Sequence, residues 1–101
     1  MNEKDVAGAL GLAQKAGKIS SGDQGVKDAL SGGKAKLLII AADTSPNTVK
    51  ELKYLADKAS VPVITCMKRT GLGLCIGKAP RAAIAVLDQG FAGLIMKKWS
   101  M

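Results

Sequence analysis

The chain of 101 residues is long enough for one domain (1–101), and 15 Lys and Arg against eight Asp and Glu give it a net charge of +7. Histidine is absent, which removes the commonest metal ligand and the commonest general base at neutral pH, so we expect no enzyme, no metal site and no cofactor. Only three residues are aromatic, so the core must consist of Ala, Val, Ile and Leu.

The cysteines and the apolar runs indicate a cytoplasmic protein. Cys66 and Cys75 are too far apart for a CxxC pair and lie in apolar surroundings, which favours buried free thiols in a reducing compartment. Residues 1–5 lack the apolar region of a secretory signal. The longest apolar run, Leu37–Ala42, is too short to span a membrane. We therefore expect a cytoplasmic protein without a membrane partner, and a monomer.

In the first half of the chain, apolar residues over 6–16 recur at helical spacing, and a glycine follows them. Residues 18–20 form a short extended piece. A second helix is expected to begin with Asp23 as its N-cap and to end at Gly32-Gly33. The continuously apolar run Leu37–Ala42 predicts a strand that is covered on both faces.

The second half continues the alternation. Ser45-Pro46 predicts the start of a third helix, with Ser45 as its N-cap. Residues 61–66 and 82–87 read as strands, and a short helix around 72–76 separates them. Asp88 caps a last helix. Helices and strands in alternation predict an α/β fold, a three-layer α/β/α sandwich with a mixed four-stranded sheet.

The segment Ser20–Lys27 predicts an anion site. It reads as an extended piece, a turn at Gly22, and a helix start that is open to solvent. Backbone N–H groups of a helix's first turn have no partner within the helix, and they lie at its positive end. We expect Ser21, Gly22, Asp23, Gln24 and Lys27 to bind an anion, and in a chain of net charge +7 that anion is nucleic-acid phosphate.

A second candidate is the loop Lys78-Ala79-Pro80-Arg81, in which two cations precede a buried strand. Taken alone it is an ordinary turn, and it gains interest if it lies beside the Gly22 turn. The preceding Gly71–Lys78 resembles a phosphate-binding loop but lacks the required glycine and hydroxyl, so helix packing explains it better. Asp43-Thr44-Ser45 is explained by capping of the following helix.

The order of short motifs resembles the kink-turn-binding ribosomal-protein superfamily of the L-seven-Ae type, and within it the bacterial YlxQ group. The likeness covers nearly the whole chain and is carried by Gly17-Lys18, Ser21-Gly22, Gly33–Leu38, Ala42-Asp43, Asn47-Thr48, Val61-Pro62-Val63, Leu74–Lys78 and Ala85–Ala92. The resemblance implies an α/β/α sandwich that binds bent RNA through a Gly-Thr-(Asn or Lys)-(Glu or Gln)-x-x-Lys motif at a helix start, together with a loop before the last strand.

Carried over by this resemblance, Gly22 matches the glycine, Asp23 the threonine and Gln24 the Asn or Lys, while Lys78–Arg81 matches the loop. Gly25 and Asp28 depart from the motif, because one lacks a side chain to read a guanine and the other would repel phosphate. We expect a non-enzymatic, ribosome-associated protein that binds structured, kink-turn-like RNA. The alternative is a protein-interaction adaptor of the same fold whose RNA site has degenerated.

Overall fold

The computed structural model describes residues 3–100. Its centre is a sheet of the strands β1 (Ile19–Ser21), β2 (Leu37–Ile40), β3 (Val63–Thr65) and β4 (Ala83–Val86), in the order β1-β4-β2-β3. β2 runs parallel to β3 and antiparallel to β4, which in turn is antiparallel to β1. The sheet is therefore mixed and four-stranded, as predicted.

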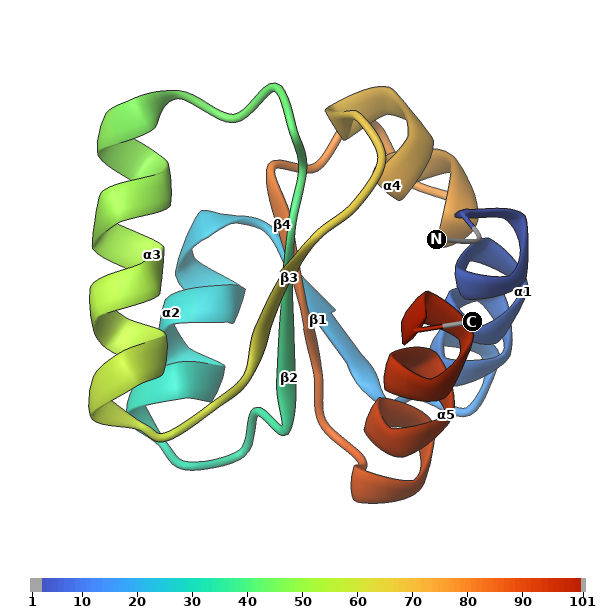
Figure 1. Cartoon of the computed structure of the whole chain (residues 1–101), viewed down its shortest axis with the longest axis horizontal. Helices are drawn as coiled ribbons and strands as arrows, with labels where there is room; N and C mark the ends of the chain where they lie inside the picture. The colour runs from blue at the N-terminus through green and yellow to red at the C-terminus, as the bar shows by residue number, and fades with distance from the viewer. Residues whose placement is uncertain (1–2, 101) are drawn as a thin grey trace.

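Helices cover both faces of this sheet (Figure 1). The helices α2 (Asp23–Ser31) and α3 (Pro46–Lys58) lie on one face. The other face carries α1 (Glu3–Lys15), α4 (Arg69–Cys75) and α5 (Gln89–Ser100). The arrangement confirms the predicted three-layer α/β/α sandwich.

The two faces of the sheet build two separate cores because side chains alternate along a strand. Leu37 and Ile39 of β2 are buried together with residues of α1, α4 and α5. Their neighbours Leu38 and Ile40 are buried against α2 and α3. Burial on both faces explains why the sequence shows a continuous apolar run here instead of an alternating one.

The predicted helix starts in the second half are confirmed. Ser45 Oγ accepts a hydrogen bond from Thr48 N–H (3.4 Å), with Pro46 as the first helical residue. Asp88 Oδ2 accepts one from Phe91 N–H (3.0 Å) at the start of α5. Both are local interactions between residues three apart, which is why a sequence motif can reveal them.

The strands β2, β3 and β4 are shorter than their apolar runs predicted, whereas β1 has the predicted length and begins one residue later. The predicted run Leu37–Ala42, for example, ends as a strand at Ile40. The next residue is still buried and Ala41 N–H donates to the Ala82 carbonyl (2.8 Å), but in a connection outside the ladder. Burial therefore extends beyond strand pairing, and hydropathy alone overestimates strand length.

One further expectation needs correction. Cys66 is buried, as expected, but Cys75 at the end of α4 is only half-buried and packs against the margin of the core on this face of the sheet. In the described part of the chain, none of the helices combines the length and the apolar character that crossing a membrane requires.

Candidate nucleic-acid interface

The turn before α2 is made by Gly22, whose φ of 85° and ψ of 159° suit glycine and strain other residues. Helix α2 begins directly after it, and the first hydrogen bond joins Val26 N–H to the Gly22 carbonyl (3.1 Å). The N–H groups of residues 23–25 therefore have no acceptor within the helix. The predicted open helix start is present.

The prediction that Asp23 caps this helix is wrong. Gly22 is the N-cap, no side chain accepts a capping hydrogen bond there, and Asp23 is the first helical residue. The prediction relied on the preference of aspartate for N-caps, but the backbone turn requires a positive φ that only glycine adopts readily. As a result, no capping carboxylate occupies the N–H groups at the helix start.

The loop Lys78–Arg81 lies beside this turn, as the site prediction required. Arg81 Nε donates to Ser21 Oγ (3.2 Å), and Arg81 Nη1 donates to the carbonyls of Ala79 (3.2 Å) and Pro80 (3.3 Å). One guanidinium group thus links the end of β1 to the loop before β4. That these two segments contact RNA stays a prediction.

Helix α4 holds the loop in place through its backbone. Lys78 N–H donates to the Gly73 carbonyl (2.8 Å), and Arg81 N–H donates to the Arg69 carbonyl (3.0 Å). Gly73 cannot be replaced without movement, because a Cβ atom there would lie 2.3 Å from the Ala79 carbonyl oxygen. The glycine that looked like part of a phosphate loop is therefore a packing residue, in agreement with the helix-packing interpretation.

Asp43 and Thr44 support the same loop, and the expectation that they serve the following helix is corrected. Asp43 Oδ1 accepts from Arg69 N–H (2.9 Å), and this hydrogen bond holds the pKa of the Asp43 carboxyl below its ordinary value. Thr44 Oγ1 donates to the Ala82 carbonyl (3.0 Å). Only Ser45 of this trio caps α3. Sequence reasoning missed Arg69, because its partners lie on distant segments.

Lys27 and Gln24 are less available than predicted. Lys27 Nζ lies 3.2 Å from Asp23 Oδ2 and 3.0 Å from Glu51 Oε1, and its side chain is only 27% exposed. Hydrogen bonds to Glu51 and Asp23 raise the pKa of Lys27 above its ordinary value. Gln24 Nε2 donates to Asp28 Oδ1 (2.8 Å). Three carboxylates thus hold the two predicted side-chain donors of α2, and Glu51 of α3 was missed.

The loop side of the site is more open. Lys78, Ala79 and Pro80 are exposed, and within residues 3–100 Lys78 forms no ion pair. Leu74, four residues earlier on α4, is 79% exposed, which is unusual for a large apolar side chain. Arg81, in contrast, is half-buried, as Lys27 is. The free cation and the apolar side chain lie on the loop side of the site.

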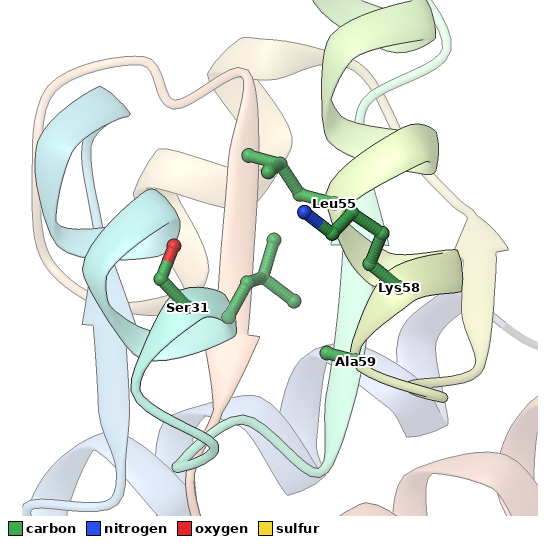
Figure 2. A pocket seen from close by; sticks show the side chains of 5 residues that line it. Ser31, Leu55, Lys58 and Ala59 are labelled. Carbon is green, nitrogen blue, oxygen red and sulfur yellow. The ribbon is translucent and has the colours of Figure 1, made fainter.

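Hollows near the site are small. A cavity of about 50 Å³ lies between Gly22 of the turn, α3 and the start of β4. A wider hollow of about 220 Å³ separates α2 from α3 farther along, where Leu30, Leu55 and Ala59 line it and the Lys58 ammonium lies at its rim (Figure 2). In the described chain, no three His, Cys, Asp or Glu side chains are grouped to hold a metal ion. The site is therefore a surface of donors and cations instead of a pocket.

Comparison with known proteins places this fold in a family. Residues 4–95 match the model of the "Ribosomal protein L7Ae/L30e/S12e/Gadd45 family". The chain is 38% identical over 87 residues to the RNA-binding protein YlxQ of Bacillus subtilis, covering 86% of this chain and 87% of that one. It is 34% identical over 89 residues to the large ribosomal subunit protein eL8 of Picrophilus torridus, covering 87% and 70%.

A solved structure agrees. A protein of unknown function from Bacillus halodurans superimposes with a TM-score of 0.90 at 30% identity, over 99% of this chain and all of that one. The sequence resemblance, the sandwich with its mixed sheet, and the match over residues 4–95 agree. The chain belongs to the L7Ae/L30e/S12e/Gadd45 family of ribosomal proteins and is similar within it to the YlxQ proteins.

Proposed function

We propose that this chain is a non-enzymatic RNA-binding protein that is cytoplasmic and ribosome-associated. It recognises structured, kink-turn-like RNA through the start of α2 and the loop Lys78–Arg81. The observation that carries this proposal is the hydrogen bond between Arg81 Nε and Ser21 Oγ (3.2 Å), which fixes two donor-bearing segments side by side. Relatives named as RNA-binding and ribosomal proteins support it.

The uncapped start of α2 would hold a phosphate. Its free N–H groups carry the partial positive charge of the helix terminus, and they need no side chain to bind an anion. Lys78 would pair with a neighbouring phosphate, since it is exposed and has no carboxylate partner within residues 3–100. Leu74, exposed beside this loop, would pack on an unstacked base.

Base reading by α2 would be weak. Gly25 has no side chain for hydrogen bonding, and Asp28 both repels phosphate and holds the amide of Gln24. Lys27 must first leave Asp23 or Glu51. Backbone and loop contacts would therefore supply most of the affinity, and binding would depend strongly on salt.

The same carboxylates favour the second candidate, a protein-interaction adaptor of this fold. Asp23, Asp28 and Glu51 surround the helix start that RNA would approach. A partner with its own cations would find these carboxylates attractive, whereas a phosphate would not. This candidate predicts no preference among RNAs.

A gel-shift panel separates the candidates. The protein is titrated against a kink-turn RNA, a plain duplex and a single strand, each at two salt concentrations. We expect the kink-turn to bind tightest, with a log–log salt slope of about −0.9 for each phosphate contacted. The single strand should bind weakly, because few aromatic side chains exist to stack its bases. Equal binding of all three RNAs would contradict the proposal.

A further inference from the structure

Three lysines gather at the end of the sheet opposite the loop Lys78–Arg81. Leu87 N–H donates to the Lys18 carbonyl (2.8 Å), and Lys36 N–H donates to the Val86 carbonyl (2.7 Å). Ile19 of β1 and Leu37 of β2 both pair with Val86. Since neighbouring strands lie about 4.8 Å apart, the backbones of Lys18 and Lys36 are roughly 10 Å apart across β4.

Lys34 completes this group, which we call the lysine end (Lys18, Lys34 and Lys36). Gly33 turns the chain with a φ of 72°, and Lys34 N–H donates to the Ala29 carbonyl (3.0 Å) at the end of α2. Lys34 and Leu87 line a hollow of about 390 Å³, and Lys36 and Gln89 line another of about 320 Å³. Lys34 and Lys36 thus border concave surface.

The charge of the lysine end is not neutralised. All three lysines are exposed, and in the described chain none of them forms an ion pair. Two carboxylates lie near this end: Asp28, which lines the same hollow as Lys34, and Asp88, which follows Leu87. Both keep their negative charge while they accept hydrogen bonds from the neutral donors Gln24 Nε2 and Phe91 N–H, so three lysines face two carboxylates. A surplus of positive charge therefore faces solvent at this end.

The alternative explanation is that these lysines only complement helix dipoles. Lys18 and Lys34 do follow the C-termini of α1 and α2. Each helix end carries roughly −0.5 charge, less than the one full charge of the lysine beside it. Lys36 directly precedes β2 and does not belong to a helix end. The dipoles of α1 and α2 therefore account for part of this charge and leave an excess.

We propose that the lysine end is a second RNA-binding surface, which holds the phosphate backbone of a duplex segment while the Gly22 turn holds a bent one. This inference rests on RNA being the partner proposed above. Lysine presents a point charge without the planar fork of arginine, so the contact is to phosphates and carries no sequence preference. The two surfaces lie on opposite ends of a molecule measuring 27 × 26 × 24 Å, so one copy would bridge two RNA segments.

The test uses the full chain in three forms: the unaltered protein, the variant Lys18→Gln/Lys34→Gln/Lys36→Gln, and the control Lys4→Gln/Lys53→Gln/Lys97→Gln. The control removes the same charge from exposed lysines on three separate helices. Each protein is titrated with a duplex RNA of about 20 base pairs, and a log–log salt slope is measured. A kink-turn RNA, immobilised and saturated with protein, is then offered the same duplex carrying a fluorophore.

We expect the lysine-end variant to bind the duplex at least about tenfold more weakly than the control variant does, with a log–log salt slope that is shallower by about 2 to 3. It should bind the kink-turn nearly as well as the control does, but fail to recruit the fluorescent duplex. Equal duplex binding and equal recruitment by the two variants would overturn the inference. If the unaltered protein does not prefer the kink-turn, the proposed function is overturned instead. The duplex titration still tests the lysine end in that case, because it does not use the kink-turn RNA.

Discussion

The guanidinium of Arg81 and the hydroxyl of Ser21 lie 3.2 Å apart although 60 positions separate them in the chain. Ser21 ends β1, and Arg81 precedes β4, which is the antiparallel neighbour of β1. The same guanidinium also donates to the Ala79 and Pro80 carbonyls. A single side chain thus aligns the loop with the helix start.

Removing this link should weaken RNA binding. Ser21→Ala deletes one acceptor and releases the loop from its place beside the helix start, so ordering the loop again on binding should cost at most the roughly 1 kcal/mol of the lost hydrogen bond, a fall in kink-turn affinity of up to about fivefold. Arg81→Lys should cost more, because lysine has no planar fork to reach several acceptors at once. Ser20→Ala is the matched control, since Ser20 is the neighbouring serine on β1 and Arg81 does not donate to it. Equal losses for both serine variants, measured by titration, would contradict this role.

Freeing Lys27 should increase RNA affinity. Glu51→Gln removes the carboxylate that lies 3.0 Å from Lys27 Nζ. We expect kink-turn affinity to rise by about threefold and the salt slope to steepen by less than about 1, because Lys27 then gains a phosphate contact. Asp57→Asn on the same helix changes the net charge equally from an exposed position and is the control. An equal gain in the control would mean that overall charge alone is responsible.

The departures from the family motif predict a gain-of-function variant. Gly25→Glu would supply a guanine acceptor, and Asp28→Lys would release Gln24 and add a phosphate partner. A good base contact is worth about 1–3 kcal/mol, so the double variant should bind a kink-turn at least about tenfold tighter. If the double variant gains no affinity in a titration at fixed salt, the family motif does not align with this segment in the way that starts at Gly22.

A side chain at Gly25 also crowds a neighbouring residue of β1. A Cβ atom at Gly25 would lie 2.8 Å from Ser20 Oγ, so the serine side chain must rotate. Adding Ser20→Ala to the double variant removes that oxygen. We expect this third change to raise the melting temperature of the double variant without altering its RNA affinity, which thermal unfolding and the same titration measure.

The two glycines Gly73 and Gly93 should respond in opposite ways to alanine. At Gly73 the new methyl group would meet the Ala79 carbonyl at 2.3 Å, and overpacking of this kind costs about 1–3 kcal/mol. At Gly93, an exposed position on α5, nothing lies within 4 Å, and alanine is the better helix former by roughly 1 kcal/mol. Gly73→Ala should therefore lower the melting temperature and displace the Lys78–Arg81 loop, whereas Gly93→Ala should raise it. A neutral Gly73→Ala would show that the loop is not held as described.

Alkaline pH should destabilise the protein through Cys66. Burial raises the pKa of this thiol to about 11, and the negative charges of Glu3 and Cys75 contribute. The folded state therefore binds the proton more tightly than the unfolded chain, so this contribution is complete below about pH 9 and is lost as the pH rises to about 11. Urea unfolding is measured at about pH 8 and about pH 10.5. Between these two pH values the free energy of unfolding should fall more for the unaltered protein than for Cys66→Ala. Parallel losses would rule out the thiol as the cause.

The sequence by itself determined the features that depend on neighbouring residues. Residue-type periodicity gave the order of helices and strands, because each element needs a buried face of its own period. Ser45-Pro46 and Asp88 revealed two helix starts, since a cap bonds to a residue three positions away. Gly22 marked the turn before α2 for the same local reason.

Tertiary structure decided which side chains are free to act. Lys27 looked available until α3 brought Glu51 to 3.0 Å from it, and Arg69 gained its role only when Asp43 came within 2.9 Å of its N–H. Arg81 is held beside the start of α2 by its hydrogen bond to Ser21. Lys18 and Lys36 are neighbours because β1 and β2 both pair with β4. These contacts join residues far apart in the chain, so the packing of helices on the sheet sets them, and no local pattern records that packing.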